Sequence, residues 1–176
     1  ATSFCEKCPQ YSKNEDFVFV GSEDCLYLNV WRPQSQEVNL PVYFWIHGGG
    51  NTVGTASSDE FNGANMAFRS NMVVVTINYR LGPLGWFTHP ALRTGDAQDD
   101  SGNYGNLDFR KALEWVRDNI EAFGGDPNNI TIAGESAGAG NVLSLVISPL
   151  STGLFHKGIM QSGSLSCRSV SQGEGH

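Results

Sequence analysis

The stretch "ITIAGESAGAG", residues 130–140, decides the fold of this chain. An apolar run leads into a glycine, an acid and Ser136, and a second apolar run follows at once. This pattern predicts a buried strand that turns sharply into a helix, with Ser136 on the turn. Gly134 and Gly138 have no side chains, so the turn can tighten until the serine hydroxyl projects above the sheet. The alternative is a glycine-lined turn whose serine only caps the helix.

Other apolar segments of strand length lie on both sides of this junction. Residues 40–46 and 72–79 are almost continuously apolar, as expected for strands that are covered on both faces. Shorter strands are predicted at residues 25–31, 129–133 and 157–161. Helical patterns separate several of these strands, and strands joined in this way form parallel βαβ units. The sequence therefore predicts an α/β fold with a doubly wound, mostly parallel sheet.

Two of the segments between strands have a helical pattern. Residues 106–125 carry apolar side chains at spacings of three and four, and the two final glycines end the helix. These apolar side chains are Phe109, Leu113, Val116, Ile120 and Phe123. Residues 136–148 predict a helix that starts at the serine turn. Residues 88–103 are expected to form a surface loop, and residues 1–16 and 164–176 to be surface segments without regular structure.

Composition excludes several classes of function. The 176 residues are enough for one domain, and 40% of them are hydrophobic, so a core is expected. The net charge of −7 disfavours binding to a nucleic-acid backbone, since an acidic surface repels phosphates. The longest apolar runs are sized for buried strands, so we expect no membrane span.

The four cysteines indicate a disulfide rather than a metal site. Cys5 and Cys8 form a CxxC pair, but no second pair or nearby histidine completes a set of four ligands. A disulfide from Cys25 to Cys5 or to Cys8 would close a surface loop. Such a bond implies an oxidising compartment, so a secreted or periplasmic location is expected.

A second glycine-rich motif follows the predicted strand at residues 40–46. In "HGGG", residues 47–50, the glycines let backbone N–H groups converge on one point, where a developing oxyanion can be held. We expect Gly49 and Gly50 to be such donors, with the N–H of Ala137 as the third. His47 is expected to orient this loop and not to act as a catalytic base.

Taken together, the motifs resemble the type-B carboxylesterase family, the cholinesterase-like branch of the α/β-hydrolases. The resemblance covers nearly all of residues 22–164. It is carried by "SEDCLYLNVWRP" (22–33), "HGGG" (47–50), "INYRLGPLGW" (77–86), "GNYGNLD" (102–108), "ALEWVRDNIEAFGGDPNNITIAGESAG" (112–138) and "GLFHKGIMQSGS" (153–164).

This resemblance implies hydrolysis of a small carboxylic ester through an acyl-enzyme on Ser136, with no metal or organic cofactor. It also implies that Glu135 and Ser162 lie near the serine as polar neighbours. Further implied features are a buried ion pair between Arg80 and Asp108, and a disulfide from Cys25 to an upstream cysteine. Asn51 departs from the family pattern because relatives commonly place an aromatic residue there, beside the acyl site. Asn106 and Phe109 are departures expected to affect packing.

The general base and acid of such an enzyme follow the serine in the order serine, acid, histidine. Only 40 residues follow Ser136, and none of the four histidines is in a suitable place: His47, His89, His156 and His176. We therefore expect residues 1–176 to form a single, partial α/β-hydrolase domain, with a sheet edge and an apolar face left uncovered. The remaining portion, in a longer chain or as a separate polypeptide, would supply the acid and the histidine.

Two other functions fit parts of the sequence. A cholinesterase-like binding module without catalysis would share the fold, but such proteins usually lack the serine that is present here. An esterase of the hormone-sensitive-lipase type also carries "HGGG" and GxSxG. The stretch "EDCLYLN" (23–29) and Glu135 in "GESAG" favour the type-B family.

Overall fold

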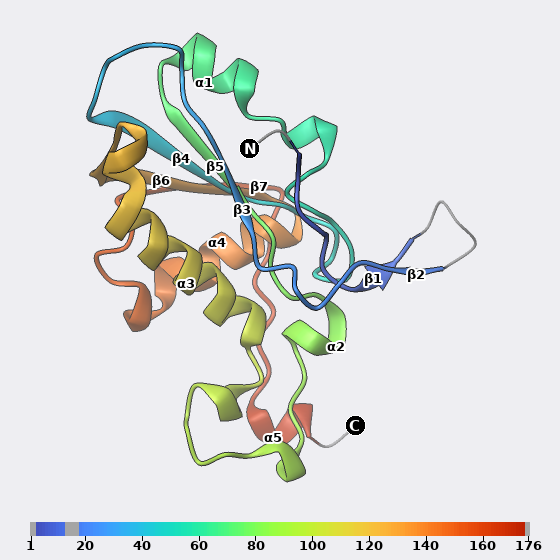
Figure 1. Cartoon of the computed structure of the whole chain (residues 1–176). Coiled ribbons are helices and arrows are strands. Elements are labelled where there is room, and N and C mark those ends of the chain that lie inside the picture. The colour runs from blue at the N-terminus through green and yellow to red at the C-terminus, as the bar shows by residue number, and fades with distance from the viewer. Residues whose placement is uncertain (1–2, 13–17, 175–176) are drawn as a thin grey trace.

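A five-stranded sheet forms the centre of the computed structural model, which describes residues 3–12 and 18–174 (Figure 1). Its strands lie in the order β3, β5, β4, β6, β7. Their bounds are β3 Leu28–Trp31, β4 Leu40–Ile46, β5 Val73–Ile77, β6 Gly125–Glu135 and β7 Lys157–Gln161. Neighbours among β4 to β7 pair in parallel, and β3 pairs antiparallel with β5. The mostly parallel sheet predicted from the sequence is confirmed, with one antiparallel edge strand.

Helices cover the two faces of the sheet unequally. The α-helices are α1 Ala64–Ser70, α2 Gly82–Gly85, α3 Tyr104–Asn119, α4 Ala137–Ile147 and α5 Val170–Gly173. The 3₁₀ helices are η1 Asp59–Phe61, η2 Pro90–Leu92, η3 Asp99–Ser101, η4 Ile120–Phe123 and η5 Pro149–Ser151. Leu113 of α3 and Val142 of α4 pack on the face that carries Phe44, and all three are fully buried. Apolar burial of this kind is the main stabilising contribution to the fold.

The opposite face of the sheet is covered by the segment between β4 and β5. The ring of Phe61 lies 5.7 Å from that of Trp45, and Gly63 packs so tightly on Val74 that a side chain there would clash. Trp45 remains partly exposed, whereas its neighbour Phe44 is buried. The α1 side of the sheet is therefore less completely covered than the side on which α3 and α4 lie (Figure 1).

Some elements differ from the sequence prediction in extent. Strand β6 begins at Gly125 instead of residue 129, because Gly125 pairs with Leu40 on the far side of an irregularity in the ladder. Helix α3 begins at Tyr104 and changes to a 3₁₀ turn at Ile120, before Gly124 ends it with a φ of +80°. Both changes lie at ends of elements, where apolar periodicity carries little information.

The two ends of the chain contain regular structure that the sequence prediction lacked. Strands β1 Gln10–Tyr11 and β2 Phe19–Val20 pair as an antiparallel ribbon. Near the other end, the side chain of Ser169 caps α5, a single short turn, by accepting a hydrogen bond from the N–H of Gln172. These elements are too short to show an apolar pattern, so the expectation of no regular structure was wrong there.

Strand β7 forms one edge of the sheet and is exposed along its whole length. Its apolar residues Ile159 and Met160 are 43% and 47% exposed. Within residues 3–12 and 18–174, no helix has the length and hydropathy needed to cross a bilayer.

Candidate active site

Ser136 lies on the turn between β6 and α4, and its backbone is strained. It is exposed, with φ of 54° and ψ of −121°, a region that residues other than glycine rarely adopt. The flanking glycines permit this turn, because a Cβ at Gly138 would clash with the carbonyl oxygen of Ile46, and one at Gly134 would lie 2.9 Å from that same oxygen. The strand-to-helix turn predicted from the sequence is therefore present, with the serine at its apex.

Neighbouring backbone groups hold the serine turn in place. The N–H of Ser136 donates to the carbonyl of Gln161 at the end of β7, at 2.9 Å. The carbonyl of Ser136 accepts from the N–H groups of Ala139 and Gly140 at 3.0 and 3.1 Å. Ser162 follows Gln161 directly and is exposed, with φ of 56°. The chain that carries Ser162 thus passes the serine turn.

The glycine loop after β4 lies against the serine turn. An ideal Cβ on Gly48 would be 3.3 Å from Cβ of Ser136 and 3.1 Å from Oε2 of Glu135. Gly49 and Gly50 are exposed and have φ of 102° and 63°, which glycine adopts without strain. Their N–H groups donate no hydrogen bond to any described residue. The structure therefore brings the two sequence motifs together, with free backbone donors on the loop.

Ala137 contributes the start of a helix to the same region. It is the first residue of α4, and the N–H groups of a helix's first turn have no acceptor within the helix. The partial positive charge at this end of a helix favours a nearby oxyanion. Three backbone N–H groups, those of Gly49, Gly50 and Ala137, therefore belong to segments in contact beside Ser136.

His47 lies beneath the glycine loop and is 1% exposed. Its Nδ1 donates to the carbonyl oxygen of Gly48 at 2.7 Å, because that oxygen can only accept. In the neutral ring Nε2 then carries no proton, and it is buried without a partner among the described residues. Burial lowers the pKa of His47 to about 4, while the bond to Gly48 opposes that shift. Its ring stacks on Tyr79 at 4.3 Å, an arrangement that suits a loop-orienting residue.

The other described histidines lie in structural positions. His89 Nδ1 accepts a hydrogen bond from the N–H of Ala91 at the start of η2. His156 Nδ1 accepts one from the N–H of Ile130, where β6 meets the segment leading to β7. His176 lies outside the described residues. The histidines between residues 3 and 174 thus have roles that do not require contact with Ser136.

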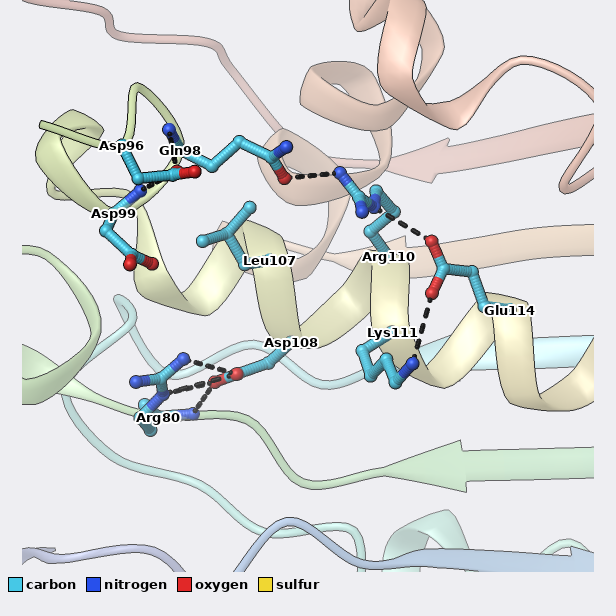
Figure 2. A pocket seen from close by; sticks show the side chains of 9 residues that line it. All are labelled: Arg80, Asp96, Gln98, Asp99, Leu107, Asp108, Arg110, Lys111 and Glu114. Atoms are coloured by element: carbon cyan, nitrogen blue, oxygen red, sulfur yellow. Dashed lines mark hydrogen bonds and ion pairs between the residues drawn. The ribbon is translucent and has the colours of Figure 1, made fainter.

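Arg80 and Asp108 form a bidentate ion pair that joins the segment after β5 to α3 (Figure 2). Arg80 Nη2 lies 2.7 Å from Asp108 Oδ1, and Arg80 Nε lies 2.9 Å from Oδ2. The backbone N–H of Arg80 also donates to Oδ2 at 3.0 Å. The carboxylate raises the pKa of Arg80. The pair is only half-buried, a correction to the expected burial, because the Arg80 side chain is 35% exposed against 6% for Asp108.

A polar cleft of about 400 Å³ lies beside this ion pair and along α3 (Figure 2). Its lining residues are Arg80, Asp96, Gln98, Asp99, Leu107, Asp108, Arg110, Lys111 and Glu114. Glu114 binds both Arg110 and Lys111, so most of the charges are paired with one another. The lining includes no residue of the serine turn or the glycine loop. We therefore do not assign this cleft to the substrate.

The disulfide joins Cys25 to Cys8, so Cys5 is not its partner. Both bonded residues are 1% exposed, whereas Cys5 and Cys167 are exposed thiols. Of the two cysteines in the CxxC pair, one is thus in a disulfide and the other is an exposed thiol. In the described part of the chain, no cluster of three histidine, cysteine or acidic side chains has the geometry to hold a metal ion.

The residues that depart from the family pattern make internal contacts. Asn106 accepts a hydrogen bond from the Ser144 hydroxyl at 2.8 Å, and Phe109 is fully buried, so both serve packing around α3. The side-chain amide of Asn51, which stands where relatives commonly have an aromatic residue, pairs with that of Asn141 in α4, at 2.9 and 3.3 Å. No local sequence signal identifies this contact, because 90 residues separate the two.

Comparisons with known proteins agree with this geometry. The model of the carboxylesterase family matches residues 1–175. The chain is 46% identical over 172 residues to the bile salt-activated lipase of Mus musculus, covering 93% of this chain and 28% of the lipase. It is also 46% identical over 167 residues to the para-nitrobenzyl esterase of Bacillus subtilis, covering 93% of this chain and 33% of that esterase.

Solved structures show the same relationship. A carboxylesterase of Geobacillus stearothermophilus superposes with a TM-score of 0.83 at 48% identity, covering 93% of this chain and 33% of that one. A PNB esterase superposes with a TM-score of 0.82 at 44% identity, covering 92% and 33%. The chain thus spans about a third of the length of these relatives. Its sheet has the arrangement of part of an α/β-hydrolase fold. From its sequence and its fold, the chain belongs to the carboxylesterase family.

Proposed function

We propose that this protein hydrolyses carboxylic esters through an acyl-enzyme on Ser136. The observation that carries the proposal is the strained, exposed turn at Ser136, with the glycine loop in contact with it. Backbone strain of this kind persists only where the surrounding structure enforces it, and strained residues cluster at active sites. A serine nucleophile on a strand-to-helix turn is one such case. A serine that only caps a helix would not need it.

In the proposed reaction, the Ser136 hydroxyl loses its proton to a general base while its oxygen attacks the ester carbonyl. The carbonyl π electrons move to the oxygen, and the N–H groups of Gly49, Gly50 and Ala137 stabilise the negative charge. Collapse of this intermediate breaks the bond to the alcohol, which leaves with the proton from the base. Water then attacks the acyl-enzyme by the same route and releases the acid. These steps use only protein groups and water.

We further propose that the base and its acidic partner lie outside residues 1–176. The histidines of the described region have other structural positions, and the chain covers 28% and 33% of two relatives that it resembles closely. The exposed edge strand β7 supports the same proposal, because further sheet could pair there. Residues 1–176 would then be one part of a larger catalytic domain, in which Glu135 and Ser162 are polar neighbours of the nucleophile.

Names of related proteins support an ester as the substrate. They include a para-nitrobenzyl esterase, a fumonisin B1 esterase and an acetylcholinesterase, each 46% to 50% identical to this chain over the matched region. These names differ widely in the alcohol or acid that they specify. We therefore propose the carboxylic ester as the shared chemical class.

The Cys8–Cys25 disulfide supports a secreted or periplasmic location.

Labelling with a fluorophosphonate tests the proposal, since such probes react with activated serines. The complete protein that contains this chain is incubated with the probe, digested and analysed by mass spectrometry. We expect one equivalent of label on Ser136, together with ester turnover. Ser136→Ala should lose both the label and at least about 1,000-fold of turnover. Ser70→Ala, which changes an exposed serine at the end of α1, should keep both. Wild-type protein that takes no label would overturn the proposal.

A further inference from the structure

The proposed oxyanion donors belong to two separate segments of the chain. Gly49 and Gly50 follow β4, whereas Ala137 begins α4. Donors aimed at a transition state must be held within about 0.5 Å of their working positions. Some contact must therefore fix the distance between the glycine loop and the start of α4.

The amide pair of Asn51 and Asn141 connects these two segments directly. Asn141 Nδ2 donates to Asn51 Oδ1 at 2.9 Å, and Asn51 Nδ2 donates to Asn141 Oδ1 at 3.3 Å. Asn51 is the residue after the glycines, and Asn141 lies four residues after Ala137, one helical turn along the same face. Asn141 is 6% exposed, so its amide has little access to water as an alternative partner.

Further contacts fix Asn51 from the side of β5. Its backbone carbonyl accepts from the N–H of Gly82 at 2.7 Å. The hydroxyl of Tyr79 donates to the carbonyl of His47 at 2.8 Å and lies 3.4 Å from Asn51 Oδ1. Asn51 itself has a left-handed backbone, with φ of 57°. Asparagine tolerates this conformation better than most residues, so one residue type satisfies both the backbone and the amide contact.

We propose that Asn51 and Asn141 are positioning residues for ester hydrolysis, and that their amide pair sets the spacing between the glycine-loop donors and Ala137. This inference rests on the function proposed above. Neither side chain needs to touch the substrate. Loss of one amide leaves the other without its partner in a protected site, so the loop and the helix can separate. The transition state then loses more stabilisation than the bound substrate does, because the oxyanion forms only during the reaction.

Asn51→Gly is the most direct variant, since glycine keeps the left-handed backbone and removes the amide. In the complete protein we expect kcat to fall about 10- to 100-fold while KM changes less than about threefold. Asn71→Gly is the matched control. Asn71 is exposed, ends α1 with φ of 48° and lies outside the proposed site, so its replacement should leave kcat and KM unchanged.

A double-mutant cycle tests whether the two amides act as one unit. Asn141→Ala should lower kcat about as much as Asn51→Gly, and the double variant should be no worse than the poorer single variant. A trifluoromethyl ketone, which forms a tetrahedral adduct with the serine, should bind more weakly by the same factor as kcat/KM falls. Rates are expressed per serine labelled by the fluorophosphonate, which removes any effect of misfolded protein.

Two results would overturn the positioning role. In one, the variants unfold at lower temperature but keep wild-type kcat for each labelled serine, as expected of a purely structural contact. In the other, the two losses multiply in the double variant, which means that the residues act independently. Failure of the proposed function gives a different result, because wild-type protein would then show neither label nor turnover.

Discussion

His47 is a neutral ring held in a site that does not accept its charged form. Its pKa is lowered to about 4 by burial, whereas an exposed histidine has a pKa of 6.5. Between these values the unfolded chain binds a proton that the folded chain does not bind. The contribution of His47 to stability is thus fully present above pH 6.5 and is lost as the pH falls towards 4.

This asymmetry predicts a pH dependence of stability. Relative to His47→Gln, the wild-type free energy of unfolding should fall by about 3 kcal/mol between pH 6.5 and 4, from about 1.4 kcal/mol for each pH unit. Urea unfolding at several pH values measures this difference. Comparison with the variant cancels the contribution of carboxylates that titrate in the same pH range, because both proteins contain them. The exposed His89→Gln is the control and should follow the wild type. Parallel curves for wild type and His47→Gln would contradict the assignment of a neutral, buried ring.

At the scale of elements, the Arg80–Asp108 pair joins the segment after β5 to α3. Three hydrogen bonds at 2.7 to 3.0 Å converge on one carboxylate that is 6% exposed, so removal of its charge leaves donors without acceptors. We expect Asp108→Asn to lower the free energy of unfolding by about 2 to 3 kcal/mol.

Asp118→Asn provides the comparison for that measurement. Arg117 and Asp118 also form an ion pair, but both side chains are about half exposed, at 47% and 57%. Pairs of this kind contribute little to stability, because water and dissolved salt screen the two charges. Urea unfolding should therefore separate the two variants clearly. Equal effects would mean that the Arg80–Asp108 pair is not a structural link between these elements.

Strands with long apolar runs are predicted from the sequence more accurately than short ones. The bounds of β4 and β7 match the predicted segments, since apolar runs between turn residues define them well. Strand β3 was also predicted, but its direction was not, because side-chain periodicity is the same in parallel and antiparallel strands. The ribbon of β1 and β2 was missed because two-residue strands have no period to detect.

In the candidate site, likewise, the sequence predicts residues in local motifs but not contacts between distant segments. The motifs predict Ser136, Gly49 and Gly50 as site residues, because a tight turn restricts which residues can occupy each position. The contact between Asn51 and Asn141 was not identified, since it depends on the pairing of distant strands and not on local residue type. The choice between Cys5 and Cys8 was open for a similar reason. Both lie at workable distances along the chain, and only the fold brings one of them to Cys25.

For the whole molecule, the Cys8–Cys25 disulfide ties the N-terminal segment to the start of the sheet. It closes a loop with a sequence separation of 17, for which a chain-entropy model gives about 3 kcal/mol of stabilisation. We expect the double variant Cys8→Ser/Cys25→Ser to lose about that amount in thermal or urea unfolding. Wild-type protein treated with a reductant should show the same loss.

Cys5→Ser is the control for this experiment, because Cys5 is an exposed thiol. It should have wild-type stability and keep its sensitivity to reductant, whereas the double variant should be insensitive to reductant. A loss of stability in Cys5→Ser equal to that of the double variant would contradict the pairing with Cys8.

The hydrogen bond from Ser136 to Gln161 has a consequence for how the chain is made. The turn at Ser136 depends on β6 pairing with β4, which is synthesised long before it, and with β7, which is synthesised after it. Contacts between such distant segments form late, because each must close a long loop. A ribosome-bound or unfolded chain therefore carries an ordinary serine of low reactivity. On this view, the proposed nucleophile stays latent until translation has passed Gln161 and the central strands have assembled.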